Sequence, residues 1–355
     1  MKQNSAVSNE KLQSDVISFL RFPLIIGVIM THVGISTKGC ESPELYNATC
    51  YLFKQILVRI AVPMFFMFSG FLLFNKCVSY TPKIYLQKIK SRIWTLLIPY
   101  LIWNLITIVF VNGLISNIDD FLRAFWNLHI DPKSGGITPT YPISLQFWYI
   151  RDLMVLVLFS PVIYWLVKKF NIGLIITLGI LWIFNWWYPI SGFCITAVFF
   201  FSLGSYFSIH KKSFIGKLKG YLPHLAVLYG ALIVLVLILH FSEWAPLCCI
   251  TILIRITILI GIAFTLSLTA RMIQNGKWKV NKFISESSFF IFACHLLMIT
   301  CVKKIMLKFI PLNSAVSLVS MYFAITIVVT LGGLVGYYIM KKYLPKITGF
   351  ITGGR

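Results

Sequence analysis

Two ionisable residues, Arg21 and His32, flank the otherwise apolar stretch RFPLIIGVIMTH near the start of the chain. Because eleven residues make about three turns of an α-helix, the two side chains would share one face, about 16 Å apart along the axis. An imidazole titrates near neutral pH and can accept a proton from a hydroxyl, whereas a guanidinium binds anionic groups. The spacing therefore predicts one helix face that carries a base and a cation.

The composition predicts that this face lies inside a membrane. Of the 355 residues, 58% are hydrophobic and 12% are charged, and the mean hydropathy is +0.85. Apolar runs long enough to cross a bilayer recur along the chain, so we expect an all-α, polytopic bundle of about ten transmembrane helices. We expect the first run to be a retained helix rather than a signal peptide. The spans are predicted near residues 16–36, 52–74, 93–112, 145–167, 172–188, 189–209, 221–241, 247–270, 285–303 and 314–340.

The basic residues predict the orientation of this bundle. With the N-terminus inside, 21 of the 32 Lys and Arg residues fall in cytoplasmic segments, 7 fall outside and 4 fall within spans. Such a bias orients membrane proteins during insertion. We therefore expect cytoplasmic tails at 1–13 and 346–355 around a single membrane domain at 14–345. The net charge of +22 follows from topology and contact with anionic lipids, so no nucleic-acid partner is expected.

Ionisable side chains within the predicted spans are candidates for function, because burying a charge in a membrane costs free energy. For Arg21 and His32, the structural alternative is an arginine that reaches the membrane surface and a neutral core histidine. Pro23 is expected to weaken the first helix where a ligand could enter. Arg151 and Asp152 are adjacent and would diverge by about 100° on a helix, so we expect each to pair elsewhere, Asp152 with Arg59 or Arg255. Their role is either a structural network or substrate contact.

Four further segments join RFPLIIGVIMTH in a recognisable order. They are AVPMFFMFSGFLLF (61–74), SRIWTLLIPYLIW (91–103), QFWYIRDLMVLVLFSPVIYWL (146–166) and SSFFIFACHLLMI (287–299). Taken together, from about residue 14 to 340, the chain resembles the membrane-bound acyltransferase 3 family. It departs from that pattern at Thr95, where a second basic residue is common, and at Phe292, where tyrosine is usual.

The resemblance implies an integral enzyme of the plasma (inner) membrane that transfers an acyl group, most often acetyl. The donor would be cytoplasmic acyl-CoA, the acceptor a hydroxyl of a saccharide or lipid-linked saccharide, and no permanently bound cofactor is implied. His32 would be the catalytic base, and Arg21 would lie near the path of CoA. A basic ring of Lys88, Lys90 and Arg92 would hold the CoA phosphates by charge-assisted hydrogen bonds. The residues expected to line the cavity or contact substrate are Trp148, Arg151, Asp152, Ser288 and His295.

Other classes of function stay open from the residues alone. A transporter or flippase for a lipid-linked saccharide would also place charges and histidines around a central cavity and contain broken helices. A membrane sensor or structural subunit would tolerate the loss of Arg21 and His32.

Several other residues have simpler interpretations. The eight cysteines lack metal-ligand spacing, so no metal site is expected, and Cys40 and Cys50 either form a disulfide or stay as thiols. Ser69 lacks the glycine two residues before it that a serine nucleophile would need, and Gly70 is expected to permit close helix packing. Residues 113–145 are expected to form an interfacial helix followed by a loop.

Overall fold

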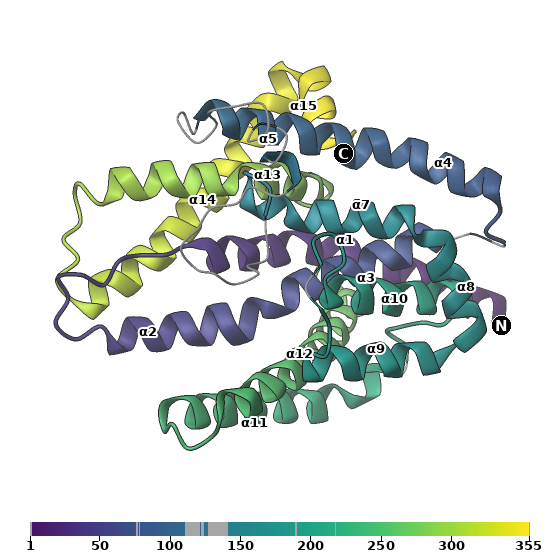
Figure 1. Ribbon diagram of the computed structural model, residues 1–355, viewed down its shortest axis with the longest axis horizontal. Coiled ribbons are helices and arrows are strands. Elements are labelled where there is room, and N and C mark those ends of the chain that lie inside the picture. The colour runs from purple at the N-terminus through teal and green to yellow at the C-terminus, as the bar shows by residue number, and fades with distance from the viewer. Residues whose placement is uncertain are drawn as a thin grey trace. The chain divides into compact units, whose positions relative to one another are not determined.

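A computed structural model describes residues 2–354 except Lys76, Val78, 111–120, Leu122, Arg123, 127–140, Pro189 and Lys217. The elements of the described residues are all helical, as Figure 1 shows, which agrees with the predicted fold class. They fall into two compact units. Unit 1 comprises Met1–Phe65, Lys211–Ser288 and Met298–Gly332, and unit 2 comprises Phe66–His210, Phe289–Leu297 and Gly333–Arg355.

The described helices match the predicted apolar segments, although not all of them are long enough to span a membrane. Seven stretches pass by length and composition: Glu10–His32, Glu44–Phe74, Pro82–Phe110, Leu222–Phe241, Leu247–Gln274, Lys282–Met306 and Ala315–Tyr343. The bent pair Leu145–Leu158 and Ser160–Phe170 makes an eighth if it is one span. Two further apolar helices, Ile172–Phe184 and Ile195–Ile209, are shorter than the roughly 20 residues that a hydrocarbon core requires.

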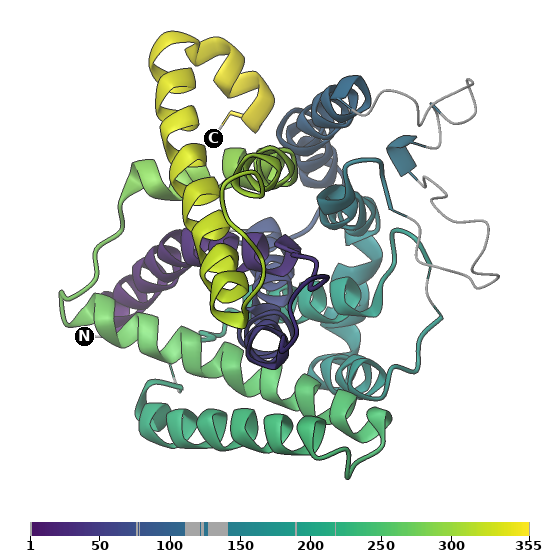
Figure 2. The same ribbon diagram turned by 90° about the vertical axis from the view of Figure 1, so that its left-hand side faces the viewer.

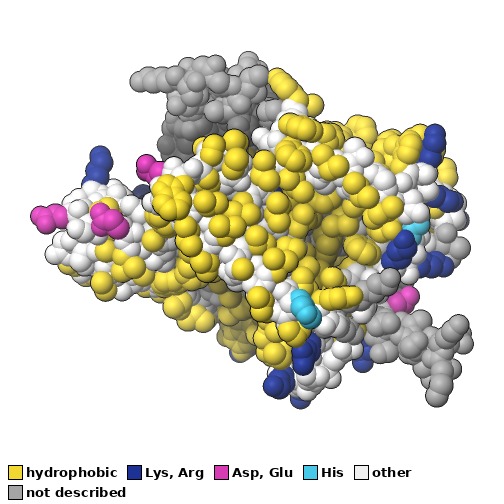
Figure 3. Space-filling model, turned by 90° about the horizontal axis from the view of Figure 1, so that it is seen from below, with side chains coloured by type: hydrophobic (Ala, Val, Ile, Leu, Met, Phe, Trp, Pro, Cys, Tyr) yellow, Lys and Arg dark blue, Asp and Glu magenta, His cyan; other side chains and the backbone are white. Residues whose placement is uncertain are grey.

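Unit 1 is built on the first helix. Its elements are α1 (Lys2–His32), α2 (Glu44–Cys50), η1 (Tyr51–Leu57), η2 (Val58–Ile60), η5 (Leu218–Tyr221), α11 (Leu222–Phe241) and α12 (Leu247–Gln274), with turns of α13 (Lys282–Met306) and α14 (Ala315–Tyr343). Helices α11 and α12 lie side by side, as Figure 2 shows, and α12 also packs on α1. Residues Val227, Val234 and Ile238 of α11 are exposed, and Figure 3 shows a largely hydrophobic face. Such a surface suits contact with lipid.

Unit 2 contains the shorter helices. They are α3 (Ala61–Phe74, from Phe66), α4 (Pro82–Arg92), η3 (Ile93–Leu97), α5 (Ile98–Phe110), η4 (Leu145–Phe147), α7 (Trp148–Leu158), α8 (Ser160–Phe170), α9 (Ile172–Phe184), α10 (Ile195–Ile209) and α15 (Pro345–Thr352). The unit also includes Phe289–Leu297 of α13 and the end of α14 from Gly333. Helices α3 and α10 meet through two glycines. A Cβ atom on Gly70 would lie 2.0 Å from the Phe201 carbonyl oxygen, and one on Gly204 would lie 1.9 Å from that of Met67. The predicted packing role of Gly70 is thereby confirmed.

The chain bends by 68° between α7 and α8. Pro161 explains the bend, because proline lacks an N–H and its ring clashes with the carbonyl of residue 157. Hydroxyl groups replace the lost backbone partners: Ser160 Oγ donates to the Val157 carbonyl at 2.6 Å, and Tyr85 Oη donates to that of Leu158 at 3.1 Å. A helix can therefore bend here without leaving these two carbonyls unsatisfied in an apolar surrounding.

The C-terminal segment is also anchored by polar contacts. The predicted cytoplasmic tail at 346–355 is largely helical in the structure, because it contains most of α15, which packs on α5. Trp103 Nε1 donates to the Ile351 carbonyl at 3.0 Å. Gly353 has a φ of 70° and approaches the backbone of Thr95 so closely that a Cβ atom would lie 2.5 Å from the Thr95 carbonyl oxygen. The end of the chain is thus held against the start of the third predicted span.

Candidate functional site

The face of α1 that carries Arg21 and His32 is turned toward protein. Both residues are half-buried, while Ile25 and Val28, which share this face, are buried. Helix α1 runs without a break through Pro23 to His32. The expected weakening near Arg21 therefore does not interrupt the helix, although proline still removes one backbone hydrogen bond there. The shared face predicted from the eleven-residue spacing is present in a continuous helix.

Two lysines and two tyrosines hold the C-terminal end of α1 in unit 1. Lys54 Nζ donates to the Val33 carbonyl, and Lys303 Nζ donates to the Gly34 carbonyl at 2.6 Å. Tyr322 Oη donates to the Met30 carbonyl at 3.1 Å, and the backbone N–H of Ile35 donates to Tyr46 Oη at 3.0 Å. Carbonyls at and just beyond a helix end have no partner within the helix, so Lys54, Lys303 and Tyr322 satisfy acceptors that the fold leaves open, whereas Tyr46 Oη accepts the N–H of Ile35. His32 lies at this helix end and interacts electrostatically with Lys54.

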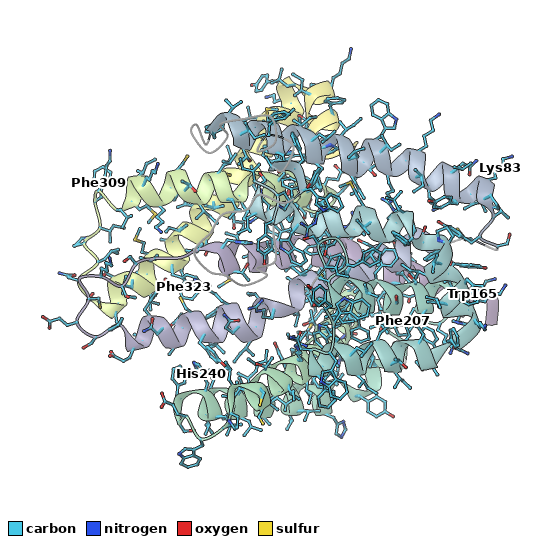
Figure 4. All side chains as sticks on the ribbon, in the orientation of Figure 1. Lys83, Trp165, Phe207, His240, Phe309 and Phe323 are labelled. Atoms are coloured by element: carbon cyan, nitrogen blue, oxygen red, sulfur yellow. The ribbon has the colours of Figure 1, made fainter. Side chains whose placement is uncertain are left out.

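Lys54 lies on an unusual segment of backbone. Residues Tyr51–Leu57 form the π-helix η1 at the start of the second predicted span. Neighbouring rings pack on this segment. Tyr51 stacks on His240 with ring centres 3.5 Å apart, and Phe53 packs edge-on against Phe323 with ring centres 5.2 Å apart. Figure 4 shows His240 near the end of α11 and Phe323 on α14. Short π-helical segments are rare and are frequent at functional sites, which draws attention to Lys54.

The predicted basic ring belongs to unit 2. Lys88, Lys90 and Arg92 all lie on α4, which begins at Pro82, so Lys88 and Arg92 share a face at i and i+4. Lys90 is two residues from each and points about 200° away, because each helical residue turns by about 100°. It is exposed. The helix thus aligns two of the three predicted phosphate ligands.

Arg92 lies among hydroxyl groups. Tyr149 and Tyr80 are its tyrosine neighbours. Tyr149 Oη is 3.1 Å from Ser69 Oγ, and Tyr80 Oη is 2.8 Å from Ser160 Oγ. A π-helical segment, η3 (Ile93–Leu97), begins directly after Arg92. A guanidinium with hydroxyl neighbours is chemically suited to a phosphate or another anion.

Arg151 and Asp152 pair with each other, so the predicted divergence was wrong. The Nε and Nη2 atoms of Arg151 donate to Asp152 Oδ1 at 3.1 and 3.0 Å, and both side chains are buried. The long arginine side chain folds back across the helix, a freedom that the angle between Cβ directions does not describe. Asp152 also accepts the backbone N–H groups of Gly192 at 3.1 Å and Cys194 at 3.4 Å. The described partners of Asp152 are therefore Arg151 and the backbone just before α10, and not the predicted Arg59 or Arg255.

These contacts favour the structural interpretation of the pair. Cys194 is the N-cap of α10, where a carboxylate is favoured by the unpaired N–H groups and the helix dipole. Arg151 Nη1 donates to the Trp126 carbonyl at 2.9 Å, and its guanidinium lies 5.6 Å from the centre of the Trp126 ring. The pair thus fastens α7 to α10 and to residue 126.

The remaining predicted cavity residues have different surroundings. His295 is fully buried on α13, and its Nδ1 lies 2.6 Å from the Phe292 carbonyl oxygen. Phe292 in turn packs against Tyr149 at 5.9 Å. Trp148 is half-buried near Phe66, with ring centres 6.2 Å apart. Ser288 is buried and donates to the Ile284 carbonyl of its own helix at 3.2 Å. His295 is thus linked to Tyr149 through Phe292, whose ring centre lies 6.0 Å from that of His295.

The polar partners of Arg92 and His32 escaped sequence reasoning. Tyr149 lies within the quoted segment at 146–166, but its aromatic type pointed to packing rather than to a hydroxyl near Arg92. Lys54 and Lys303 counted only as external basic residues. The position of Lys54 within the predicted span 52–74 was a signal that could have marked this lysine as a candidate functional residue.

Two other predictions concern the segments outside the bundle. The interfacial helix predicted within 113–145 falls mostly outside the described residues. Cys40 and Cys50 are described, and both are free thiols. The described residues contain no group of three or more His, Cys, Asp or Glu side chains that could hold a metal ion.

Comparison with known proteins identifies a relative of the chain and its family. The chain is similar to the succinoglycan biosynthesis protein ExoH of Rhizobium meliloti (strain 1021), with 26% identity over 161 residues. That alignment covers 43% of this chain and 43% of the relative, so the chain spans less than half the length of the curated relative that it matches. No solved structure matches the chain. The profile of the acyltransferase domain of type 3 matches residues 15–338, which is most of the chain. The chain therefore belongs to the acyltransferase 3 family.

Proposed function

We propose that the protein transfers an acyl group from acyl-CoA to a hydroxyl of a saccharide or lipid-linked saccharide at the plasma membrane. The observation that carries this proposal is the family match over residues 15–338, together with a first helix that presents Arg21 and His32 on one protein-facing side. The printed name of the relative, a succinoglycan biosynthesis protein, favours a saccharide acceptor. An acetyl group is the simplest donor group to test first.

In the proposed reaction, His32 acts as the base. Its imidazole accepts the proton of the acceptor hydroxyl while the oxygen attacks the thioester carbonyl carbon. The tetrahedral intermediate then collapses, the C–S bond breaks, and the imidazolium returns its proton to the departing CoA thiolate. The products are the saccharide ester and CoA with a free thiol, so the histidine is regenerated without another reactant.

The cationic residues suit the polyanionic donor. Lys88 and Arg92 share a face of α4, and Arg92 lies near the hydroxyls of Tyr80 and Tyr149. These groups would bind CoA phosphates by charge-assisted hydrogen bonds. Arg21 lies on α1 about 16 Å from His32 along the axis, a distance comparable with the length of the thin arm that ends in the thioester.

The test is transfer of radiolabel from acetyl-CoA to a saccharide acceptor by the purified protein in lipid nanodiscs. His32→Ala is expected to lower turnover about 10²- to 10⁴-fold, as the loss of a general base does, while the protein stays folded in the membrane. His224→Ala is the matched control, because His224 is exposed on α11. Full activity of His32→Ala would remove the proposed base.

A transporter of lipid-linked saccharides gives a different result in the same assay. The 68° bend between α7 and α8 is the kind of broken helix that such transporters use. A transporter would leave the thioester intact and move labelled acceptor across proteoliposomes. Consumption of thioester with formation of labelled ester distinguishes the enzyme from the transporter.

A further inference from the structure

Two ammonium groups converge on the C-terminal end of α1. Lys54 and Lys303 donate to the carbonyls of the adjacent residues Val33 and Gly34, although they come from η1 and α13. Consecutive Cα atoms are about 3.8 Å apart, so the two bonded carbonyls are neighbours along the backbone just after α1 in unit 1. The ring of Tyr322 lies 5.2 Å from Lys54 Nζ, so this cation also faces an aromatic surface.

The positive charge there exceeds what the helix end can balance. The C-terminus of a helix carries roughly half a negative charge, whereas two ammonium groups carry two positive charges. Among the described residues, the ion pairs are Arg151 with Asp152 and Lys282 with Glu286, and neither includes Lys54 or Lys303. Helix capping therefore accounts for the position of the lysines, and none of the described ion pairs neutralises their charge.

Both lysines also keep hydrogen-bond donors to spare. An ammonium group has three N–H donors, and the carbonyl of Val33 or Gly34 takes one from each lysine. His32 immediately precedes Val33 and interacts electrostatically with Lys54. An anionic group bound between the lysines would thus lie beside the histidine at which the proposed transfer occurs.

We propose that Lys54 and Lys303 bind a carboxylate or phosphate group carried by a substrate of the proposed transfer. This inference rests on the proposed function, because it assigns part of the substrate recognition at His32. The anion has two possible sources, an acyl group with its own carboxylate or an acidic acceptor. In both cases the lysines orient the substrate, and His32 remains the base.

The first arm of the test compares acetyl-CoA with succinyl-CoA as donors to one neutral oligosaccharide. If the acyl group supplies the anion, Lys303→Gln lowers kcat/KM for succinyl-CoA about tenfold, as the loss of one charged hydrogen bond does, and changes acetyl-CoA little. The second arm keeps acetyl-CoA and compares a neutral with a uronic-acid oligosaccharide. If the acceptor supplies the anion, the same selective loss occurs for the uronic acid.

Matched variants separate binding from folding. Lys304→Gln removes the exposed neighbouring lysine and is expected to change neither arm. Lys54→Gln should act like Lys303→Gln, and Lys54→Arg, which keeps the cation, should restore much of the selectivity. Equal losses for neutral and anionic substrates in the Lys54→Gln and Lys303→Gln variants, or no loss for either, would overturn the anion site.

A binding measurement keeps this outcome distinct from failure of the proposed function. If the wild-type protein consumes no thioester, the proposed transfer fails, and the site is tested by thermal unfolding with sodium pyrophosphate at constant ionic strength. A ligand that binds the folded state raises the unfolding midpoint. A rise in wild type and Lys304→Gln that is lost in the Lys54→Gln/Lys303→Gln double variant supports the site. An equal rise in all three proteins, or none in wild type, overturns it.

Discussion

Replacing Asp152 with asparagine tests whether the Arg151–Asp152 pair is structural. The change preserves the size of the side chain but removes its negative charge, so Oδ1 becomes a weaker acceptor for the two hydrogen bonds from Arg151 at 3.0 and 3.1 Å. It also weakens the acceptor for the N–H groups of Gly192 and Cys194 at the start of α10. Both charged side chains are nearly inaccessible, at 4% and 1% exposure, so the guanidinium would lose its carboxylate in a buried place.

The expected cost follows from that burial. Removing one partner of a buried ion pair destabilises a protein by about 3–5 kcal/mol. At about 2 °C per kcal/mol for a large chain, the unfolding midpoint should fall by roughly 6–10 °C. The double variant Arg151→Gln/Asp152→Asn removes both charges, so it should lose less stability than Asp152→Asn alone.

Thermal unfolding in detergent and acyl transfer per folded molecule are measured separately on the same samples. The structural interpretation predicts a large loss of stability with turnover per folded molecule changed less than about threefold, far below the 10²-fold loss of a catalytic group. An Asp152→Asn protein that unfolds at the wild-type temperature but has lost turnover would refute the structural interpretation. It would indicate that Asp152 takes part in substrate contact or catalysis.

Two further substitutions test the packing of unit 2 and the proposed donor site. Gly70→Ala should destabilise the protein by about 1–3 kcal/mol in thermal unfolding, because the new Cβ atom would lie 2.0 Å from the Phe201 carbonyl oxygen. The control Gly230→Ala should be tolerated, because a Cβ atom there would have nothing within 4 Å. Equal stability of the two variants would contradict the close contact at Gly70. Arg92→Gln should raise KM for acyl-CoA about tenfold with stability retained, as the loss of one charge-assisted hydrogen bond does. Lys90→Gln is the control, because Lys90 is exposed on the opposite face of α4. An equal change of KM in both variants would argue against a specific role for Arg92.

The family and the fold class were accessible from the sequence because they depend on patterns along the chain. Apolar runs of about 20 residues predict membrane helices directly, since every backbone group in a bilayer needs an internal partner. The spacing of Arg21 and His32 fixes a common face on any regular helix. The assignment of Gly70 to close packing likewise needed only the absence of a side chain.

The partners of individual side chains depended on the tertiary structure. Arg151 reaches Asp152 because arginine has several rotatable bonds, and sequence spacing fixes only where its Cβ atom points. The lysines at the end of α1 come from residues 21 and 269 positions away from their carbonyl partners, so no local pattern could bring them together.

The sequence by itself determined an all-helical membrane protein of the acyltransferase 3 family and the shared face of Arg21 and His32. Only the tertiary structure decided the partners of individual side chains: it placed the Lys54 and Lys303 ammonium groups at the end of α1 beside His32, and it placed Tyr80 and Tyr149 near Arg92. The physical reason is that helix periodicity is a local property of the backbone, whereas charges and hydroxyls find partners across helices that are distant in the chain.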